Sequence, residues 1–328
     1  MLSVFEGGIG AAIGRGQSGR SGVIACLVWG LLSTVLFGIG KLIGQGTDWF
    51  VILASLLKVG AFLLATVLCW RNAKDPDIVS GRSVWQAIAL GMLFHVLGDI
   101  TVILWRSLWG ITSVVSLGDV FYGASYLFLA IGLLQAVLPR QMTLNLKQTL
   151  SISVAGIVGI VFASWITFYS PTVEIPSEKT KAVAVISTER SAEAAVGKSA
   201  AAGSVPRSDQ RAPEIIQTVE RRLSRITRHL GLGFVVGDGV LGGMAVALLV
   251  AFWGGSYAQT WRLVAIAGLC LYVADMFLIY EIGRGSYQQG ALWEIFWVFS
   301  ALFFGLSAGA EQGISAQMKS RSGRREWL

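Results

Sequence analysis

Residues Trp49–Trp70 read WFVILASLLKVGAFLLATVLCW, an unbroken apolar stretch with one ionisable side chain, Lys58. About 20 mostly apolar residues are enough for an α-helix to cross the hydrocarbon core of a bilayer. This stretch alone therefore predicts a transmembrane helix.

Seven further stretches have the same character. They are Val23–Gly44, Ser83–Trp105, Val120–Leu138, Gln148–Ser170, Leu232–Gly254, Leu263–Ile282 and Ala291–Ala310. All six prolines lie between these stretches. Since proline interrupts helices, its placement supports the same boundaries. The sequence predicts an all-α membrane protein with about eight transmembrane helices.

Composition excludes several other classes of protein. The 328 residues are 54% hydrophobic and 14% charged, whereas a soluble domain carries about 25% charged residues. The net charge of +7 does not predict nucleic-acid binding, because excess Lys and Arg in a membrane protein gather in cytoplasmic loops. The three cysteines lie inside apolar runs, without the spacing of a disulfide framework or a zinc site.

Loop charge predicts the orientation. One side of the predicted membrane carries Arg15, Arg20, Arg71, Lys74, Arg82, Arg140, Lys147, Arg262, Lys319, Arg321, Arg324 and Arg325, and the short loops of the other carry Lys41, Arg106 and Arg284. The more basic side is cytoplasmic. We therefore expect both termini in the cytoplasm, in a bacterial plasma membrane or an internal membrane derived from it.

The chain is expected to contain six regions. They are a cytoplasmic N-terminus (1–22), a first membrane half with spans one to five (23–170), a disordered extracytoplasmic loop (171–213), an amphipathic Arg-rich helix (214–230), a second membrane half with spans six to eight (231–310) and a basic cytoplasmic tail (311–328).

The region 214–230 alternates apolar residues at helical spacing with Arg221, Arg222, Arg225 and Arg228. Such a helix lies on a membrane surface or binds a partner protein. A solvated helical lead-in to the sixth span is the alternative. These arginines fall on the less basic side, which long loops tolerate because they translocate largely regardless of charge.

An internal repeat is visible in the sequence. Gly98-Asp99 matches Ala274-Asp275, and about 20 residues later Asp119-Val-Phe-Tyr-Gly-Ala-Ser matches Glu294-Ile-Phe-Trp-Val-Phe-Ser. An even number of spans in each half predicts two four-helix repeats in parallel orientation. Parallel repeats occur in some transporters, with the binding site between the halves.

Ionisable residues inside membrane spans are costly and indicate function. The predicted topology places Asp99, Asp119, Asp238, Asp275, Glu281 and Glu294 in or near the outer half of the membrane. Together with Lys58 and Arg106 they predict an acidic, pseudo-symmetric ligand or ion cavity open to the outer face. Helix capping is the alternative for Asp119 and Glu294, which begin their spans, and buried pairing is the alternative for Asp99 and Asp275.

His95 lies one turn before Asp99, so an imidazole–carboxylate pair on that face is one interpretation. A lone membrane histidine also suits a haem or pigment, but the sequence favours a core histidine whose polar atoms are satisfied. The other histidine, His229, is expected at a different depth, which argues against bis-histidine haem ligation. No cofactor and no metal site are predicted.

Two segments resemble a known sensor family. Ser116-Leu-Gly-Asp-Val-Phe-Tyr-Gly-Ala-Ser-Tyr-Leu-Phe-Leu-Ala-Ile-Gly-Leu-Leu134 resembles the integral membrane sensor domain of bacterial diguanylate cyclases and histidine kinases, and Ser286-Tyr-Gln-Gln-Gly-Ala-Leu-Trp-Glu-Ile-Phe-Trp297 resembles its second copy. The resemblance implies a multi-helix input module with a cytoplasmic C-terminus. Few residues follow Ala310, so a stand-alone module without an output domain is expected.

A second resemblance is to the lysoplasmalogenase family of membrane hydrolases. It covers Gly91-Met-Leu-Phe-His-Val-Leu-Gly-Asp99 and Gly268-Leu-Cys-Leu-Tyr-Val-Ala-Asp275. It implies that Asp99 and Asp275 act as an acid–base pair on a vinyl ether, which two carboxyls can do when one is protonated and the other ionised.

The sequence favours a non-enzymatic sensory, scaffolding or accessory membrane subunit. Its expected partners are the lipid bilayer and a protein partner or a second copy of the chain. A transporter or ion pathway with an acidic outward-facing cavity and a membrane hydrolase are the alternatives.

Overall fold

The structure is a computed structural model that describes residues 17–109, 117–137, 213–224, 227–252 and 258–325, with a few helical positions at 154, 157–159, 161 and 165. Within these residues all regular secondary structure is helical. The predicted all-α class is therefore confirmed for this part of the chain.

The helices are α2 (Gln17–Ile43), α3 (Asp48–Lys74), α4 (Arg82–Trp109), α5 (Leu117–Val137), α8 (Glu214–Ser224), α9 (Thr227–Ala251), α10 (Ala258–Gly283), the short 3-10 helix η2 (Leu292–Glu294) and α11 (Ile295–Arg325). Among the described residues, seven helices are long and apolar enough to cross a membrane: α2, α3, α4, α5, α9, α10 and α11. These seven correspond to seven of the predicted spans, and they make the chain a helical membrane protein.

Several predicted regions fall wholly or mostly outside the described residues. The predicted span Gln148–Ser170 is described only at a few helical positions, and the loop 171–213 and the terminal segment 1–22 are largely outside the description. Two boundaries differ from those predicted. Helix α8 ends at Ser224 and α9 begins at Thr227, inside the expected helix 214–230.

The second difference concerns the expected tail 311–328, most of which continues α11 as helix to Arg325. Hydropathy falls at Glu311 and suggests an end there. However, Glu311 is buried and accepts hydrogen bonds from the Ser80 backbone N–H (2.9 Å) and hydroxyl (2.6 Å). The helix therefore continues because the connection between α3 and α4 satisfies its carboxylate.

Neighbouring helices pack closely where glycine lies at the contact. A Cβ atom on Gly98 of α4 would lie 2.5 Å from the ring of Tyr122 of α5, and one on Gly91 would lie 2.8 Å from Leu129. The same holds for α9 and α10, where a Cβ on Gly242 would lie 3.0 Å from Tyr272. Small residues of this kind let membrane helices approach each other.

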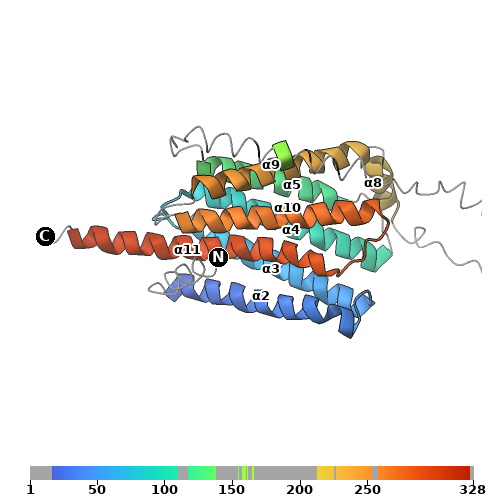
Figure 1. The fold of residues 1–328 in the computed structure, drawn as a ribbon, viewed down its shortest axis with the longest axis horizontal. Coiled ribbons are helices and arrows are strands. Elements are labelled where there is room, and N and C mark those ends of the chain that lie inside the picture. Colours follow the sequence, from blue (N-terminus) through green and yellow to red (C-terminus); the bar gives the residue numbers. More distant parts are fainter. Residues whose placement is uncertain are drawn as a thin grey trace, which may run out of the picture.

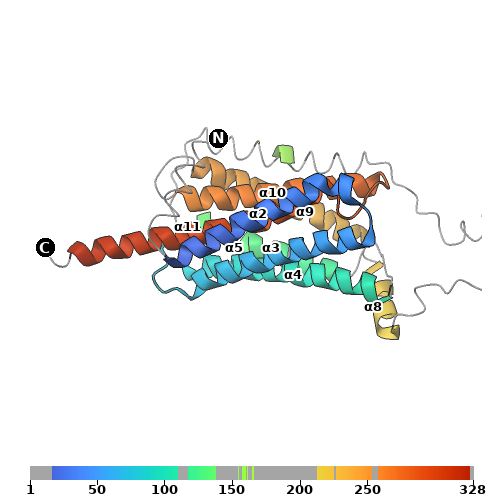
Figure 2. The same ribbon diagram turned by 90° about the horizontal axis from the view of Figure 1, so that it is seen from below.

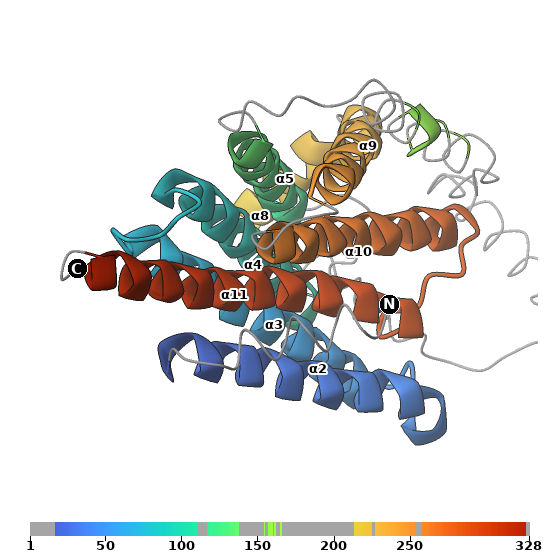
Figure 3. The same cartoon turned by 60° about the vertical axis from the view of Figure 1, so that its left-hand side comes forward.

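Six helices form a closed ring in the order α3, α4, α5, α9, α10 and α11, with α11 packed against α3. We call this the six-helix ring. Helix α2 lies outside it against α11 and α3, and Figure 3 shows it on the side opposite α5 and α9. Its outer face is apolar, with Leu31 68% exposed, as expected for a surface that contacts lipid.

The bundle has two distinct ends (Figures 1 and 2). At the Glu294 end, helices α2, α4 and α10 finish and α3, α5, α9 and α11 begin. Helix α8 lies at this end as well. At the other, the Arg325 end, α11 extends beyond the neighbouring helices.

The two halves of the ring interior differ in chemistry. In the half near the Arg325 end, Trp85 of α4 stacks on Trp261 of α10 with ring centroids 6.5 Å apart, and Phe252 packs against Trp261 at 5.8 Å. Ile88 and Met92 are fully buried in the same region. This half is a packed apolar core, and the polar side chains described next lie in the other half.

Candidate functional site

The interior of the six-helix ring contains a polar cluster near the Glu294 end, to which every helix of the ring contributes. The central polar cluster comprises Lys58 (α3), Asp99 (α4), Tyr122 and Tyr126 (α5), Asp238 (α9), Asp275 (α10), Glu294 (η2, preceding α11) and Trp297 (α11).

Lys58 and Asp99 form a buried ion pair. The Lys58 Nζ lies 2.9 Å from Asp99 Oδ1, and the two side chains are 14% and 2% exposed. Tyr122 donates its hydroxyl to the same carboxylate oxygen at 2.8 Å. A buried carboxylate is tolerated in such a place because a cation and a hydroxyl both contact its Oδ1.

Asp238 and Asp275 lie on either side of the Tyr126 hydroxyl. Its oxygen is 2.5 Å from Asp238 Oδ1 and 2.5 Å from Asp275 Oδ2. A phenol has one hydrogen, so it donates to one carboxylate and accepts from the other group. That other carboxyl group must therefore be protonated. We call Asp238 and Asp275 the carboxyl pair.

Trp297 connects the ion pair with the carboxyl pair. It donates its indole N–H to Asp275 Oδ1 at 2.9 Å. The Lys58 ammonium lies over the indole ring, 4.5 Å from its centroid, which is the geometry of a cation–π contact. Seven of the side chains, all except Glu294, are therefore one connected group rather than separate pairs.

Glu294 lies at the end of the cluster nearest the loop between α10 and η2. It is 3% exposed and accepts hydrogen bonds from the Gly290 backbone N–H (2.9 Å) and the Tyr287 hydroxyl (3.3 Å). Tyr287 lies outside the spans, and burial, followed by the neighbouring Glu294 carboxylate, raises the pKa of its hydroxyl. Tyr287 therefore remains a hydrogen-bond donor at ordinary pH.

His95 lies beside the cluster rather than in its hydrogen-bond network. Its ring stacks on Phe62 with centroids 3.9 Å apart and nearly parallel planes. Among the described residues, neither His95 Nδ1 nor Asp99 Oδ2 has a hydrogen-bond partner. The described part of the chain has no group of three His, Cys, Asp or Glu side chains placed to hold a metal ion, and the side chain of His229 lies outside the description.

The structure does not bring all the predicted site residues together. Asp119 lies in the first turn of α5, where the capping alternative placed it. Arg106 donates to Gln289 in the loop before η2. The predicted acid–base partners Asp99 and Asp275 are not paired with each other, since Asp99 pairs with Lys58 and Asp275 with Asp238.

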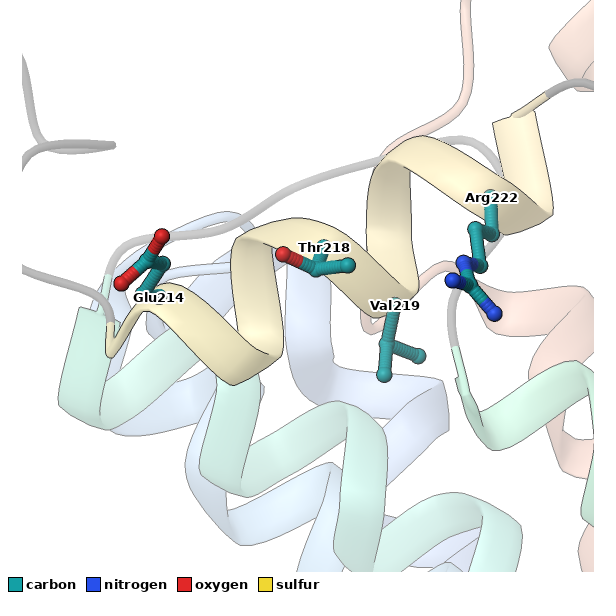
Figure 4. A pocket seen from close by; sticks show the side chains of 4 residues that line it. All are labelled: Glu214, Thr218, Val219 and Arg222. Carbon is teal, nitrogen blue, oxygen red and sulfur yellow. The ribbon is translucent and has the colours of Figure 1, made fainter.

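The arginines of the predicted amphipathic helix are also separate from the cluster. Of the four, only the Arg222 side chain is described, and it is exposed on α8. Glu214, Thr218, Val219 and Arg222 line an open pocket of about 390 Å³ along this helix (Figure 4). The lining residues that the structure describes all come from α8, at the Glu294 end of the bundle.

The aromatic members of the cluster were missed from the sequence. Tyr122 and Trp297 occupy matching positions of the repeat expected from the sequence, three residues after Asp119 and Glu294 respectively. The available signal was an aromatic residue with a polar group at the same position of both expected repeats. In each repeat an aspartate lies on the preceding helix. Tyr126 follows Tyr122 by one helical turn and carried no signal of its own.

Comparison with known proteins adds no relative: no family description, no curated protein and no solved structure matches this chain.

Proposed function

We propose that this chain is a multi-pass membrane sensory subunit whose signal is proton binding at the carboxyl pair. The observation that carries the proposal is the Tyr126 hydroxyl, which lies 2.5 Å from both Asp238 and Asp275. This arrangement holds one proton between two buried acids, and buried ionisable groups in membrane spans commonly serve proton relays. Loss or gain of that proton changes which hydrogen bonds three helices make with one another.

The apolar half of the ring favours a sensor over a transporter. A transported solute or ion has to pass from the central polar cluster to the Arg325 end. Between them the ring is filled by Trp85, Trp261 and Phe252 with buried aliphatic side chains. A sensor needs no such passage, because it transmits a change of structure.

Helix α11 provides a route for this change. Near its start, Trp297 contacts both Asp275 and Lys58. Further along, Glu311 accepts from Ser80, and Lys319 forms an ion pair with Asp77. The helix then extends beyond its neighbours, where we propose that a protein partner or a second copy of the chain reads its position.

Helix direction supports the proposed eighth span. Helices α5 and α9 both begin at the Glu294 end, because α9 is antiparallel to α10 and α10 to α11. The chain leaves α5 at the Arg325 end, so we propose that it crosses back to the Glu294 end before α9 begins. The apolar stretch Gln148–Ser170 is the segment with the length for this crossing.

Matching contacts support the proposed parallel repeats. Tyr122 donates to Asp99 from the following helix at 2.8 Å, and Trp297 donates to Asp275 from the following helix at 2.9 Å. Lys58 precedes the first pair and contacts Asp99, and Asp238 precedes the second and lies beside Asp275. Helices α3 to α5 thus correspond to α9 to α11.

We further propose that the Arg325 end faces the cytoplasm of a bacterial cell, with the central polar cluster toward the outer face. The support is the excess of Lys and Arg in the connections at the Arg325 end. In this orientation the carboxyl pair responds to acidity outside the cell.

The test uses full-length protein in liposomes with a fluorescent probe on Ser322→Cys. Acidification of the outer solution is expected to change the probe signal. Asp238→Asn and Asp275→Asn should abolish the change, whereas Asp48→Asn, an exposed acid at the Glu294 end, should not. A response that persists in both carboxyl-pair variants would rule out the proposal.

A membrane hydrolase is the second candidate, supported by two carboxyl groups in different states. One member of the carboxyl pair is protonated, while Asp99 is ionised beside Lys58, as general acid and general base require. The test is release of aldehyde from a lysoplasmalogen by the purified protein. Turnover above a boiled control that disappears in Asp99→Asn and Asp275→Asn would favour this candidate over the sensor.

A further inference from the structure

Glu294 occupies the position between the solvent at the Glu294 end and the interior of the ring. It is 3% exposed and belongs to η2, immediately before α11. We propose that Glu294 is the residue through which protons reach the central polar cluster, and that the loop 284–291 holds it in place. This inference rests on the proposed function and assigns the route to the same site.

The loop spans the end of the ring from α10 to the opposite helices. Gln289 donates its amide to the Ser55 hydroxyl of α3 at 3.2 Å and accepts from Arg106 at the end of α4. Gly290 has a φ of +83° and packs against Phe50, where a Cβ would lie 3.0 Å from the ring. Glycine is required here because other residues rarely adopt this conformation.

On the outer side of Glu294, polar groups lead to solvent. Tyr287 is 39% exposed as a residue and donates its hydroxyl to Glu294 Oε1. Arg106 is exposed and lies within electrostatic range of Tyr287. A proton arriving from water therefore meets a hydroxyl and then a carboxylate, both of which can pass it on.

On the inner side, Glu294 faces the charged members of the cluster. Lys58 of α3 and Asp99 of α4 lie within electrostatic range of Glu294, and Lys58 also interacts with Asp275 of α10. Among the described residues, Lys58, Asp99 and Tyr287 of the loop are the titratable groups that act on Glu294. From Lys58, the contacts already described lead to Asp99 and Trp297, and from Trp297 to Asp275.

The experiment measures how fast the carboxyl pair takes up protons. Full-length protein in lipid nanodiscs is acidified by rapid mixing, and the infrared carboxylic-acid band is followed in time. Asp238→Asn identifies the band of the pair. Glu294→Gln keeps an acceptor oxygen but cannot carry the proton, so uptake should slow about tenfold or more with an unchanged final amplitude. The control Asp48→Asn should match the unmodified protein.

Unchanged uptake in Glu294→Gln would overturn the inference while leaving the proposed function in place. Absence of any carboxyl-pair band change in the unmodified protein would instead overturn the proposed function, and this inference with it. If Glu294→Gln does not fold, Tyr287→Phe is a second test, because it keeps the aromatic side chain and Glu294 but removes the hydroxyl. Slower uptake in that variant supports the route, and uptake at the original rate rejects it.

Discussion

The Lys58 ammonium lies 4.5 Å above the centre of the Trp297 indole ring. The same indole donates its N–H to Asp275, and the same ammonium pairs with Asp99. One contact between two side chains therefore joins the ion pair of helices α3 and α4 to the carboxyl pair of helices α9 and α10. A change of charge in the ion pair therefore acts on the carboxyl pair, and a change of charge in the carboxyl pair acts on the ion pair.

Trp297→Phe tests this connection. The variant keeps an aromatic face for Lys58 but leaves Asp275 without its indole donor, so a loss of about 1–3 kcal/mol in the free energy of unfolding is expected. Tyr122→Phe, the matching change on α5, removes one donor from Asp99 and should cost a similar amount. Chemical denaturation in detergent measures both. Strongly unequal losses would argue against equivalent roles for the two residues.

The Lys58–Asp99 pair gives a double-mutant test. Lys58→Met or Asp99→Asn alone leaves one buried charge without its partner and should destabilise by about 3–5 kcal/mol. The combination removes both charges, so it should be much less unstable than the sum of the single changes. Lys74→Met, on the same helix, is the control. Additive losses would show that the pair does not interact.

The sequence was enough to place seven of the helices and the ionisable residues within them. Hydropathy identifies spans because a helix that crosses lipid hydrogen-bonds its own backbone groups and surrounds them with apolar side chains. It carries no record of which span lies beside which. The pairing of Asp275 with Asp238 instead of Asp99 depends on α5 lying against α9, so that Tyr126 reaches both acids.

The ends of the helices were less predictable for a related reason. Glu311 is polar and suggests an end to the last span, but a contact with Ser80, far away in the chain, holds it inside the bundle. Similarly, the position of His95 one turn before Asp99 allowed a pair with that carboxylate, whereas the structure places its ring against Phe62 of the neighbouring helix. Tertiary contacts decided both positions.

Close packing at Gly98 gives a matched pair of glycine substitutions. A Cβ at this position would lie 2.5 Å from the Tyr122 ring, whereas a Cβ on Gly123 of α5 meets nothing within 4 Å. Gly98→Ala should therefore displace Tyr122 from Asp99 and lower the thermal unfolding temperature. Gly123→Ala should leave it unchanged or raise it, since alanine favours helix by up to about 1 kcal/mol. A neutral Gly98→Ala would contradict the packing described for α4 and α5.

Cysteine labelling tests the orientation. Ser286→Cys at the Glu294 end and Ser191→Cys in the long connection should react with an impermeant thiol reagent added outside intact cells, whereas Ser322→Cys should react only after lysis. Cys26 and Cys69 are buried and should give little background. Labelling of Ser322→Cys and Ser286→Cys from the same side would contradict the proposed topology.

The six-helix ring consists of helices α3 to α5, which come first in the chain, and helices α9 to α11, which come later. Two contacts join these two groups, α5 against α9 and α11 against α3. Neither contact requires the two groups of helices to be joined by a peptide chain. The protein should therefore assemble from two separately expressed fragments divided between residues 171 and 212. In the proposed parallel repeat these two contacts are equivalent, so a fragment holding one repeat would be expected to close the same ring as a symmetric dimer.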